Sequence, residues 1–70
     1  MKNSIKVERA KKDMTQADLA KKVGVSRQTI NSIEKGKFIP STLLSLKIAA
    51  VFNETVDSIF TLESEDWDNL

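Results

Sequence analysis

The chain has 70 residues, with eleven lysines and arginines against ten aspartates and glutamates, and it contains neither cysteine nor histidine. One small domain is therefore expected, and disulfides and thiolate metal sites are excluded. No apolar run approaches the roughly 20 residues of a membrane span, and the N-terminal residues lack the apolar core of a secretory signal, so we expect a cytoplasmic protein with no membrane contact.

Hydrophobic spacing predicts five helices without an internal repeat, at about residues 5–12, 16–22, 27–35, 42–52 and 56–60. A polar residue that can cap each helix stands just before it: Asn3 or Ser4, Thr15, Ser26, Ser41 and Thr55. Asp18 completes a weak capping box with Thr15. Gly24 and Asn53 can close helices two and four in a left-handed conformation. The last residues of the acidic tail are expected to fray.

The expected core draws on all five helices, with Met14 covering one edge. Its members are Ile5, Leu19, Ala20, Val23, Val25, Ile30, Ile33, Leu44, Ile48, Phe52, Val56, Ile59 and Phe60. Helix four carries more apolar residues than one buried stripe needs, namely Leu43, Leu46, Ala50 and Val51. This excess indicates either a partner surface or a central helix that is buried on every side.

The stretch from Thr15 to Glu34, TQADLAKKVGVSRQTINSIE, reads as two short helices joined by a glycine turn. Ile30 and Ile33 give the second helix a narrow buried edge, which leaves polar side chains on its other faces: Arg27, Gln28, Thr29, Asn31 and Ser32. In a major groove, arginine can pair with guanine, glutamine or asparagine with adenine, and a threonine methyl can touch thymine. Each residue alone is more typical of a solvated helix, but the whole pattern indicates a reader of DNA sequence.

The charges are divided along the chain. Residues 1–47 hold all eleven basic residues and four acidic ones, a net charge of +7, whereas residues 48–70 hold six acidic residues and no basic one. A basic body suits contact with phosphate, and the acidic end is expected to face away from DNA. The alternative is that the basic half only solubilises the chain.

Arg9 and Glu34 allow two interpretations. Arg9 could grip a phosphate, or it could form a two-bond pair with Glu34 across the helices, since a guanidinium matches a carboxylate in shape. We favour the structural pair and leave Arg9 out of the candidate site.

TQADLAKKVGVSRQTINSIEKGK resembles the Cro/CI-type helix-turn-helix family, also called the xenobiotic-response-element family. The resemblance continues through Pro40-Ser41, Leu46-Lys47-Ile48-Ala49 and Val56-Asp57-Ser58-Ile59-Phe60, so that it covers about residues 4–62. The chain looks most like the small stand-alone bacterial and phage repressors of that family, such as the cytolysin repressor type. This implies an all-α, compact, five-helix lambda-repressor-like domain over residues 1–62, with a short C-terminal strand as an option, and an acidic tail over residues 63–70.

The resemblance also assigns roles by position. It places Gln16 where helix two contacts a phosphate and braces the recognition helix, and it places Arg27, Gln28 and Ser32 at base-reading positions flanked by Thr29 and Asn31. Lys35, Lys37 and Phe38 match a loop that follows the DNA backbone, with backbone N–H groups taking part. Arg9 and Glu34 match the family's structural ion pair. Three positions depart from the usual residues, and Glu54 is the clearest, because it replaces an apolar residue; the others are Leu43 and Asn53.

The expected function is that of a dimeric repressor that inserts helix three into the major groove of a partly symmetric operator. We predict that helix five and Phe60-Thr61-Leu62 form the dimer interface, with a short strand paired across the two-fold axis as an option. Trp67 would then pack on the partner, or it would lie in a loose tail. The alternative function is an antitoxin or adaptor that binds a protein partner. An enzyme is remote, and we expect no catalytic residue, metal, cofactor or small-molecule ligand.

Overall fold

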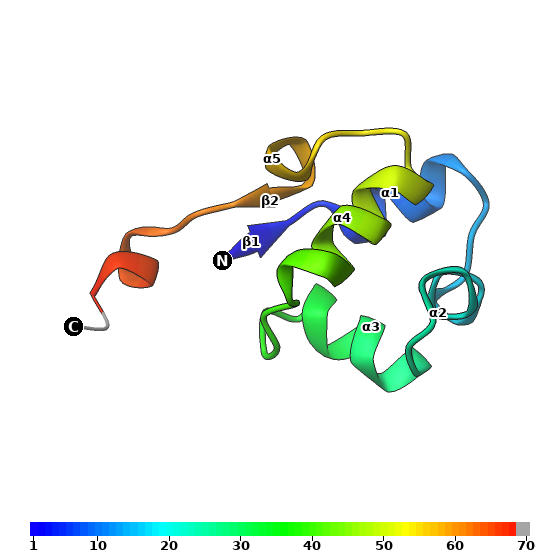
Figure 1. Cartoon of the computed structure of the whole chain (residues 1–70), viewed down its shortest axis with the longest axis horizontal. Coiled ribbons are helices and arrows are strands. Elements are labelled where there is room, and N and C mark those ends of the chain that lie inside the picture. The colour runs from blue at the N-terminus through cyan, green and yellow to red at the C-terminus, as the bar shows by residue number, and fades with distance from the viewer. Residues whose placement is uncertain (69–70) are drawn as a thin grey trace.

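The computed structural model describes residues 1–68, and these contain five α-helices, two short strands and one 3-10 helix. The helices are α1 (Ile5–Lys11), α2 (Gln16–Val23), α3 (Arg27–Glu34), α4 (Thr42–Val51) and α5 (Val56–Ile59); the other elements are β1 (Lys2–Asn3), β2 (Phe60–Thr61) and η1 (Ser64–Trp67). Figure 1 shows α4 in the middle, with α2 and α3 on one side and the strands on the other. The predicted helical fold and its short C-terminal strand are confirmed. The fraying expected at the end of the tail concerns Asn69 and Leu70, which lie outside the described residues.

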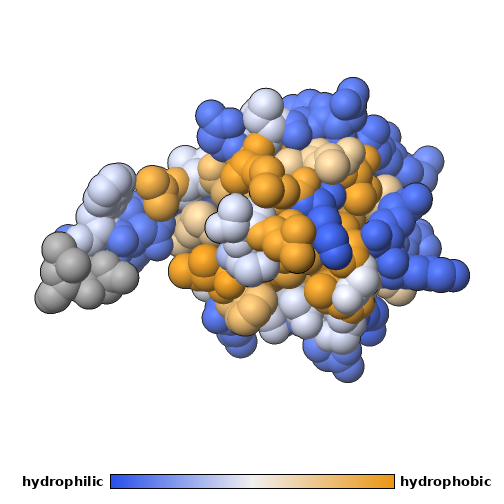
Figure 2. Space-filling view, viewed as in Figure 1, coloured by the Kyte–Doolittle hydropathy of each residue, from blue (hydrophilic) through white to orange (hydrophobic). Residues whose placement is uncertain are grey.

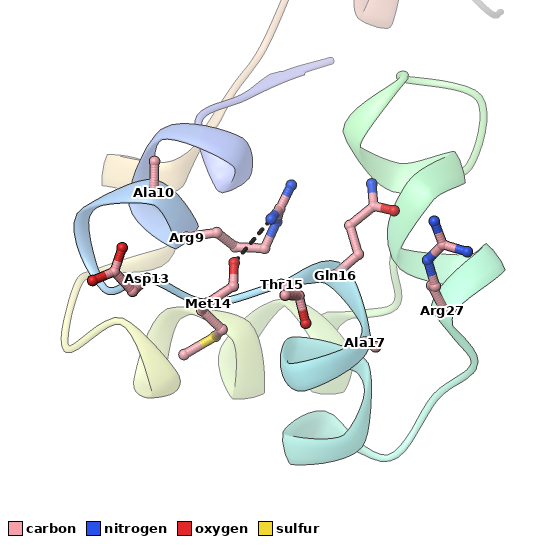
Figure 3. A pocket seen from close by; sticks show the side chains of 8 residues that line it. All are labelled: Arg9, Ala10, Asp13, Met14, Thr15, Gln16, Ala17 and Arg27. Atoms are coloured by element: carbon pink, nitrogen blue, oxygen red, sulfur yellow. Dashed lines mark hydrogen bonds between the residues drawn. The ribbon is translucent and has the colours of Figure 1, made fainter.

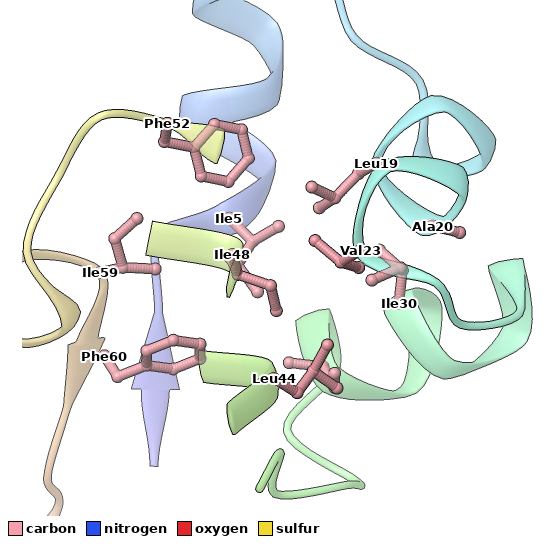
Figure 4. Packing of buried hydrophobic residues seen from close by; sticks show 11 residues of the cluster. Ile5, Leu19, Ala20, Val23, Ile30, Leu44, Ile48, Phe52, Ile59 and Phe60 are labelled. Atoms are coloured by element: carbon pink, nitrogen blue, oxygen red, sulfur yellow. The ribbon is translucent and has the colours of Figure 1, made fainter. Parts of the chain in front are cut away.

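The core forms where the apolar edges of the five helices meet (Figure 4). Most of the predicted core residues are buried, but Val25 and Val56 are only half-buried at its margin. Ala49 and Ser45 are buried although neither was predicted. The Ser45 hydroxyl donates to the carbonyl of Ser41 at 2.9 Å, which satisfies this polar group inside α4.

Local capping explains where the helices begin. The Thr15 hydroxyl accepts from the N–H of Asp18 at 3.0 Å, and the Asp18 carboxylate accepts from the N–H of Thr15 at 3.0 Å, so the predicted capping box is present. The hydroxyls of Ser26 and Ser41 cap α3 and α4 by accepting from the N–H groups of Thr29 and Leu44. The expected cap at Thr55 is wrong, because its hydroxyl lies 2.6 Å from that of Ser58 and caps no backbone N–H.

The two strands join the N-terminal residues to the segment after α5. They pair antiparallel within one chain, with Lys2 opposite Thr61 and Asn3 opposite Phe60. Pairing of a short strand across a two-fold axis was one option for this segment and stays a prediction; within one chain Phe60-Thr61 pairs with β1. Asn3 also closes the start of α1, since its side-chain oxygen accepts from the N–H of Ile5 at 3.2 Å and its NH₂ donates to the carbonyl of Ile33 at 2.9 Å.

The acidic tail forms the short helix η1 and contacts the N-terminus of the chain. The α-amino group of Met1 lies 3.0 Å from a Glu63 carboxylate oxygen and 3.2 Å from one of Asp66, so it fastens η1 beside β1. A reciprocal capping box between Glu63 and Asp66 supports the turn. Trp67 is 69% exposed and packs little on its own chain.

α4 is buried on one side only. Leu43 and Leu46 are 64% and 55% exposed, and Ile39 lies exposed just before the helix. Figure 2 shows the resulting hydrophobic surface over the face that carries α4, interrupted and bordered by hydrophilic residues. Of the two interpretations of the apolar excess, the structure therefore favours a partner surface. None of the helices in residues 1–68 has the length and hydropathy that a membrane crossing requires.

Candidate nucleic-acid interface

α2 and α3 form two helices joined by a tight turn at Gly24. Gly24 has a φ of 78°, and the N–H groups of Gly24 and Val25 both donate to the carbonyl of Ala20, at 2.9 and 3.0 Å. A left-handed residue there ends α2 and redirects the chain into α3, as predicted. Ala20 and Ile30 are buried between the helices, so the turn holds α3 at a fixed angle on the surface of the domain.

The outer side of α3 carries the residues that were expected to read bases. Arg27 and Gln28 are exposed in its first turn, whereas Asn31 and Ser32 are half-buried further along. Gln28, Thr29, Ser32 and Phe38 line one shallow hollow, so the structure brings these four candidate residues together. The half-buried Thr29 places its hydroxyl 2.9 Å from that of Ser26, the residue that caps α3.

Arg9 belongs to the scaffold of this surface. Its Nε donates to Glu34 Oε2 at 2.7 Å, its Nη2 to Glu34 Oε1 at 3.1 Å, and its Nη1 to the carbonyl of Met14 at 2.9 Å. The structural pair is therefore confirmed. Burial opposes the charge of Glu34, but hydrogen bonds from Arg9 and Gln16 outweigh it and hold the pKa of Glu34 below its ordinary value.

Gln16 braces α3 from the start of α2. Its Nε2 donates to Glu34 Oε1 at 3.0 Å and to Asn31 Oδ1 at 3.2 Å. Both hydrogens of the side-chain amide are therefore engaged inside the protein. If Gln16 contacts a phosphate, the donor is therefore its backbone N–H, which has no acceptor among residues 1–68.

A hollow opens beside the start of α2 (Figure 3). The side chains of Arg9, Gln16 and Arg27 surround it, and the first-turn N–H groups of Gln16 and Ala17 belong to residues that line it. A helix N-terminus has free donors and a partial positive charge, and the exposed Arg27 adds a full one. This arrangement suits an anion such as a phosphate.

The loop after α3 presents side chains rather than backbone donors. The N–H groups of Lys35, Gly36, Lys37 and Phe38 all donate to carbonyls of α3, two of them to Ser32 at 2.9 and 3.3 Å. The expected backbone contribution of this loop to DNA contact is therefore not supported by the geometry. The ammonium groups of Lys35 and Lys37 remain exposed for that purpose.

The acidic tail does not lie wholly apart from this loop. Glu63, Glu65 and Asp66 line a hollow together with Lys35 and Gly36. The tail was expected to face away from DNA, but the clamp at Met1 places its carboxylates within the electrostatic range of the loop.

Comparison with known proteins agrees with this geometry. The helix-turn-helix family model matches residues 5–59. The chain belongs to the Cro/CI-type helix-turn-helix family. An HTH-type transcriptional regulator of Methanocaldococcus jannaschii is 53% identical over 66 residues, which are 94% of this chain and 100% of the relative. Another from Archaeoglobus fulgidus is 52% identical over 66 residues, covering 94% of this chain and 93% of the relative.

A solved structure of this family shares the fold. A chain in a complex of the SinR and SinI proteins superposes with a TM-score of 0.73 at 33% identity, covering 91% of this chain and 67% of that chain. In the helix-turn-helix frame, α3 is the second helix of the motif and α2 the first. Sequence reasoning identified both helices correctly, but it missed that Gln16 and Asn31 are hydrogen-bonded to each other, because they are 15 residues apart.

Proposed function

We propose that this helix-turn-helix regulator inserts α3 into the major groove of an operator and represses transcription from it. The observation that carries the proposal is the exposure of Arg27 and Gln28 in the first turn of α3, beside the phosphate-suited start of α2. In this motif the N-terminal residues of the second helix meet base edges while the first helix crosses the backbone. Discrimination between base pairs comes from Arg27, Gln28 and Ser32, which Thr29 and Asn31 flank. The DNA phosphate backbone is contacted by the Gln16 N–H and by Lys35, Lys37 and Phe38.

The regulator acts as a homodimer in this proposal. Two α3 helices about 34 Å apart would enter successive major grooves and read two half-sites. The predicted interface at α5 and Phe60–Leu62 is supported by the 59% exposure of Leu62 and by an apolar groove that Leu46, Val56 and Phe60 line. A sedimentation experiment that gives a monomer at high micromolar concentration would exclude this interface.

The test of DNA reading is fluorescence-anisotropy binding to the DNA upstream of the protein's own gene and to a scrambled fragment, each at two salt concentrations. Tight, salt-dependent binding to the upstream fragment with weaker binding to the control supports a self-regulating reader of sequence. Equal, weak binding to both fragments contradicts self-regulation and directs the search to other operators or to a protein partner.

A protein partner is the second candidate. The exposed apolar face of α4 around Leu43 and Leu46 supports it, and the structural neighbour was solved together with another protein. An antitoxin or adaptor function predicts that a partner covers this face. A toxin gene adjacent to this one, and loss of binding to its product in Leu43→Ser, would favour this candidate.

A further inference from the structure

Four side chains from three helices are hydrogen-bonded in series and end at the outer side of α3. Arg9 of α1 holds Glu34 in a two-bond fork, Gln16 of α2 donates to Glu34 at 3.0 Å, and Gln16 also donates to Asn31 at 3.2 Å. Glu34 and Asn31 are both half-buried, and they lie three residues apart on α3. Because the groups are connected, the state of the first can fix the orientation of the last.

The direction of every bond in the series follows from the charge of Glu34. A carboxylate paired with arginine only accepts hydrogen bonds, so Gln16 must turn its NH₂ group toward it. The second hydrogen of that NH₂ points to Asn31, and only the side-chain oxygen of Asn31 can accept it. The orientation of both amides is therefore dictated by the ion pair.

This leaves Asn31 with a donor to offer. Its Nδ2 makes no hydrogen bond within residues 1–68. This nitrogen is also not a buried atom that lacks a partner, so it is open to solvent or to a ligand. An asparagine that pairs with adenine in the major groove uses its oxygen and its NH₂ together. The hydrogen bond from Gln16 occupies one of the two acceptor positions of the Asn31 oxygen and fixes the amide with its NH₂ group free.

We propose that the Arg9–Glu34–Gln16 series holds the Asn31 amide with its NH₂ group free, so that Asn31 contacts DNA as a hydrogen-bond donor, and that Gln16 is the positioning residue that enforces this polarity. The inference rests on the proposed DNA-reading function of α3. The Nδ2 of Asn31 then recognises a hydrogen-bond acceptor, which is either a base-edge oxygen or nitrogen or a phosphate oxygen.

The first test needs no DNA, so its outcome is independent of whether the function is correct. In the ¹⁵N-labelled full chain, the side-chain NH₂ protons of Gln16 should exchange with solvent slowly. Those of Asn31 should exchange as fast as those of the exposed Asn53. Slow exchange at Asn31 with fast exchange at Gln16 would overturn the polarity.

The second test compares Asn31→Asp with Asn31→Leu in binding to the operator. The aspartate keeps the shape and the acceptor toward Gln16 but presents a second oxygen to DNA, so it should bind at least tenfold more weakly than the leucine variant. Asn53→Asp adds the same charge on the turn after α4 and should change affinity less than threefold. Equal affinities of the two Asn31 variants would overturn the donor role.

A double-mutant cycle tests the positioning role. Gln16→Leu should weaken operator binding in the wild type, and it should weaken it at least threefold less in the Asn31→Leu background. Equal losses in both backgrounds would show that Gln16 acts without Asn31 and would overturn its positioning role. If Asn31→Leu loses affinity uniformly over operator variants, Asn31 donates to a phosphate oxygen. If the loss of affinity is confined to one base pair, Asn31 donates to that base. A wild-type protein that fails to discriminate any operator contradicts the proposed function and leaves the exchange result intact.

Discussion

Arg9 and Glu34 close a two-bond fork between α1 and α3, with Nε 2.7 Å from Oε2 and Nη2 3.1 Å from Oε1. The Arg9 side chain is 14% exposed and that of Glu34 is 9% exposed, so water screens the pair weakly. The fork ties the first helix to the end of the recognition helix, and Gln16 shares the same carboxylate. The stability of the domain and the orientation of α3 therefore both depend on this ion pair.

Replacing Arg9 with methionine should lower the free energy of unfolding by about 3 kcal/mol, because it leaves the Glu34 carboxylate largely buried without its main partner. That is a large share of the stability of a 70-residue domain. Urea unfolding followed by circular dichroism measures the change. Lys11→Met, which removes an exposed partner of Glu8, is the matched control and should cost less than 1 kcal/mol. Equal losses in the two variants would contradict the structural weight of the fork.

Acid should weaken the same contact. The pKa of Glu34 is lowered in the folded state, so the stability it contributes is present above its ordinary pKa of 4.5 and is lost as pH falls through the lower folded value. Unfolding free energies measured from pH 6 to pH 3 should therefore fall more steeply for the wild type than for Glu34→Gln. Parallel curves for the two proteins would contradict the prediction.

The helices were predictable because their start and stop signals are local. All five predicted helices end within one residue of those observed, and Thr15, Gly24 and Asn53 perform the capping and left-handed roles that their types favour. Asn53 has a φ of 56°, a conformation that asparagine tolerates better than most residues. Each of these signals needs only a few neighbouring residues.

The Arg9–Glu34 pair was predictable because a guanidinium matches a carboxylate, but other contacts between distant residues carried no such signal. The β1–β2 pair joins two-residue strands from opposite ends of the chain, and the Met1 amino group meets Asp66 across 65 positions. Neither strand is long enough to show an alternating pattern. In the candidate site, the polar residue types of α3 were enough to predict a DNA-binding helix. The hydrogen bond from Gln16 to Asn31 was not predictable, because it depends on how α2 and α3 pack.

Gln28→Ala should relax sequence preference at one operator base pair. A bidentate base contact is worth about 1–3 kcal/mol, so the ratio of operator to random affinity should fall roughly tenfold at that position. Binding titrations against single-base operator variants measure the effect. Equal losses on operator and random DNA would contradict a base-reading role for Gln28.

Lys37→Ala should instead weaken binding to all sequences by a similar factor. Its ammonium group lies on the exposed loop after α3, and loss of one phosphate contact should lower the slope of log K against log salt by about one. Lys47→Ala, an exposed lysine of α4, carries the same charge change and should alter the slope less. A selective loss on one operator sequence would contradict a backbone role for Lys37.

Neutralising Glu65 should strengthen DNA binding. This carboxylate lines the hollow that also contains Lys35, so it opposes an approaching phosphate and draws on the same local positive charge. Glu65→Gln should raise affinity by about twofold at low salt, with a smaller gain at high salt as screening grows. Glu54→Gln makes the same change on the exposed turn before α5, and an equal gain there would show an effect of net charge alone.

The contact that fastens η1 should respond to pH on both sides of neutrality. Hydrogen bonds from the Met1 amino group to Glu63 and then to Asp66 raise the pKa of this group above its ordinary value of 8.0. The contact is therefore fully formed below pH 8 and is lost as pH rises through the raised folded value. At the acid side, a backbone hydrogen bond from Glu63 and the Met1 contact lower the pKa of Asp66 from 3.8, so the contact persists until pH falls through that lower value.

The backbone amide NMR signals of η1 report on the tail and should move between pH 7 and pH 10 as the tail is released. Glu63→Gln and Asp66→Asn weaken the contact at its two carboxylates, so the alkaline transition should move to lower pH or disappear in each variant. An alkaline transition that is identical in wild type and both variants would contradict the role of the Met1 amino group. Because the tail carries the carboxylates near Lys35, its release between pH 7 and pH 10 should raise the DNA affinity of the wild type more than that of Asp66→Asn, in which the tail contact is already weakened.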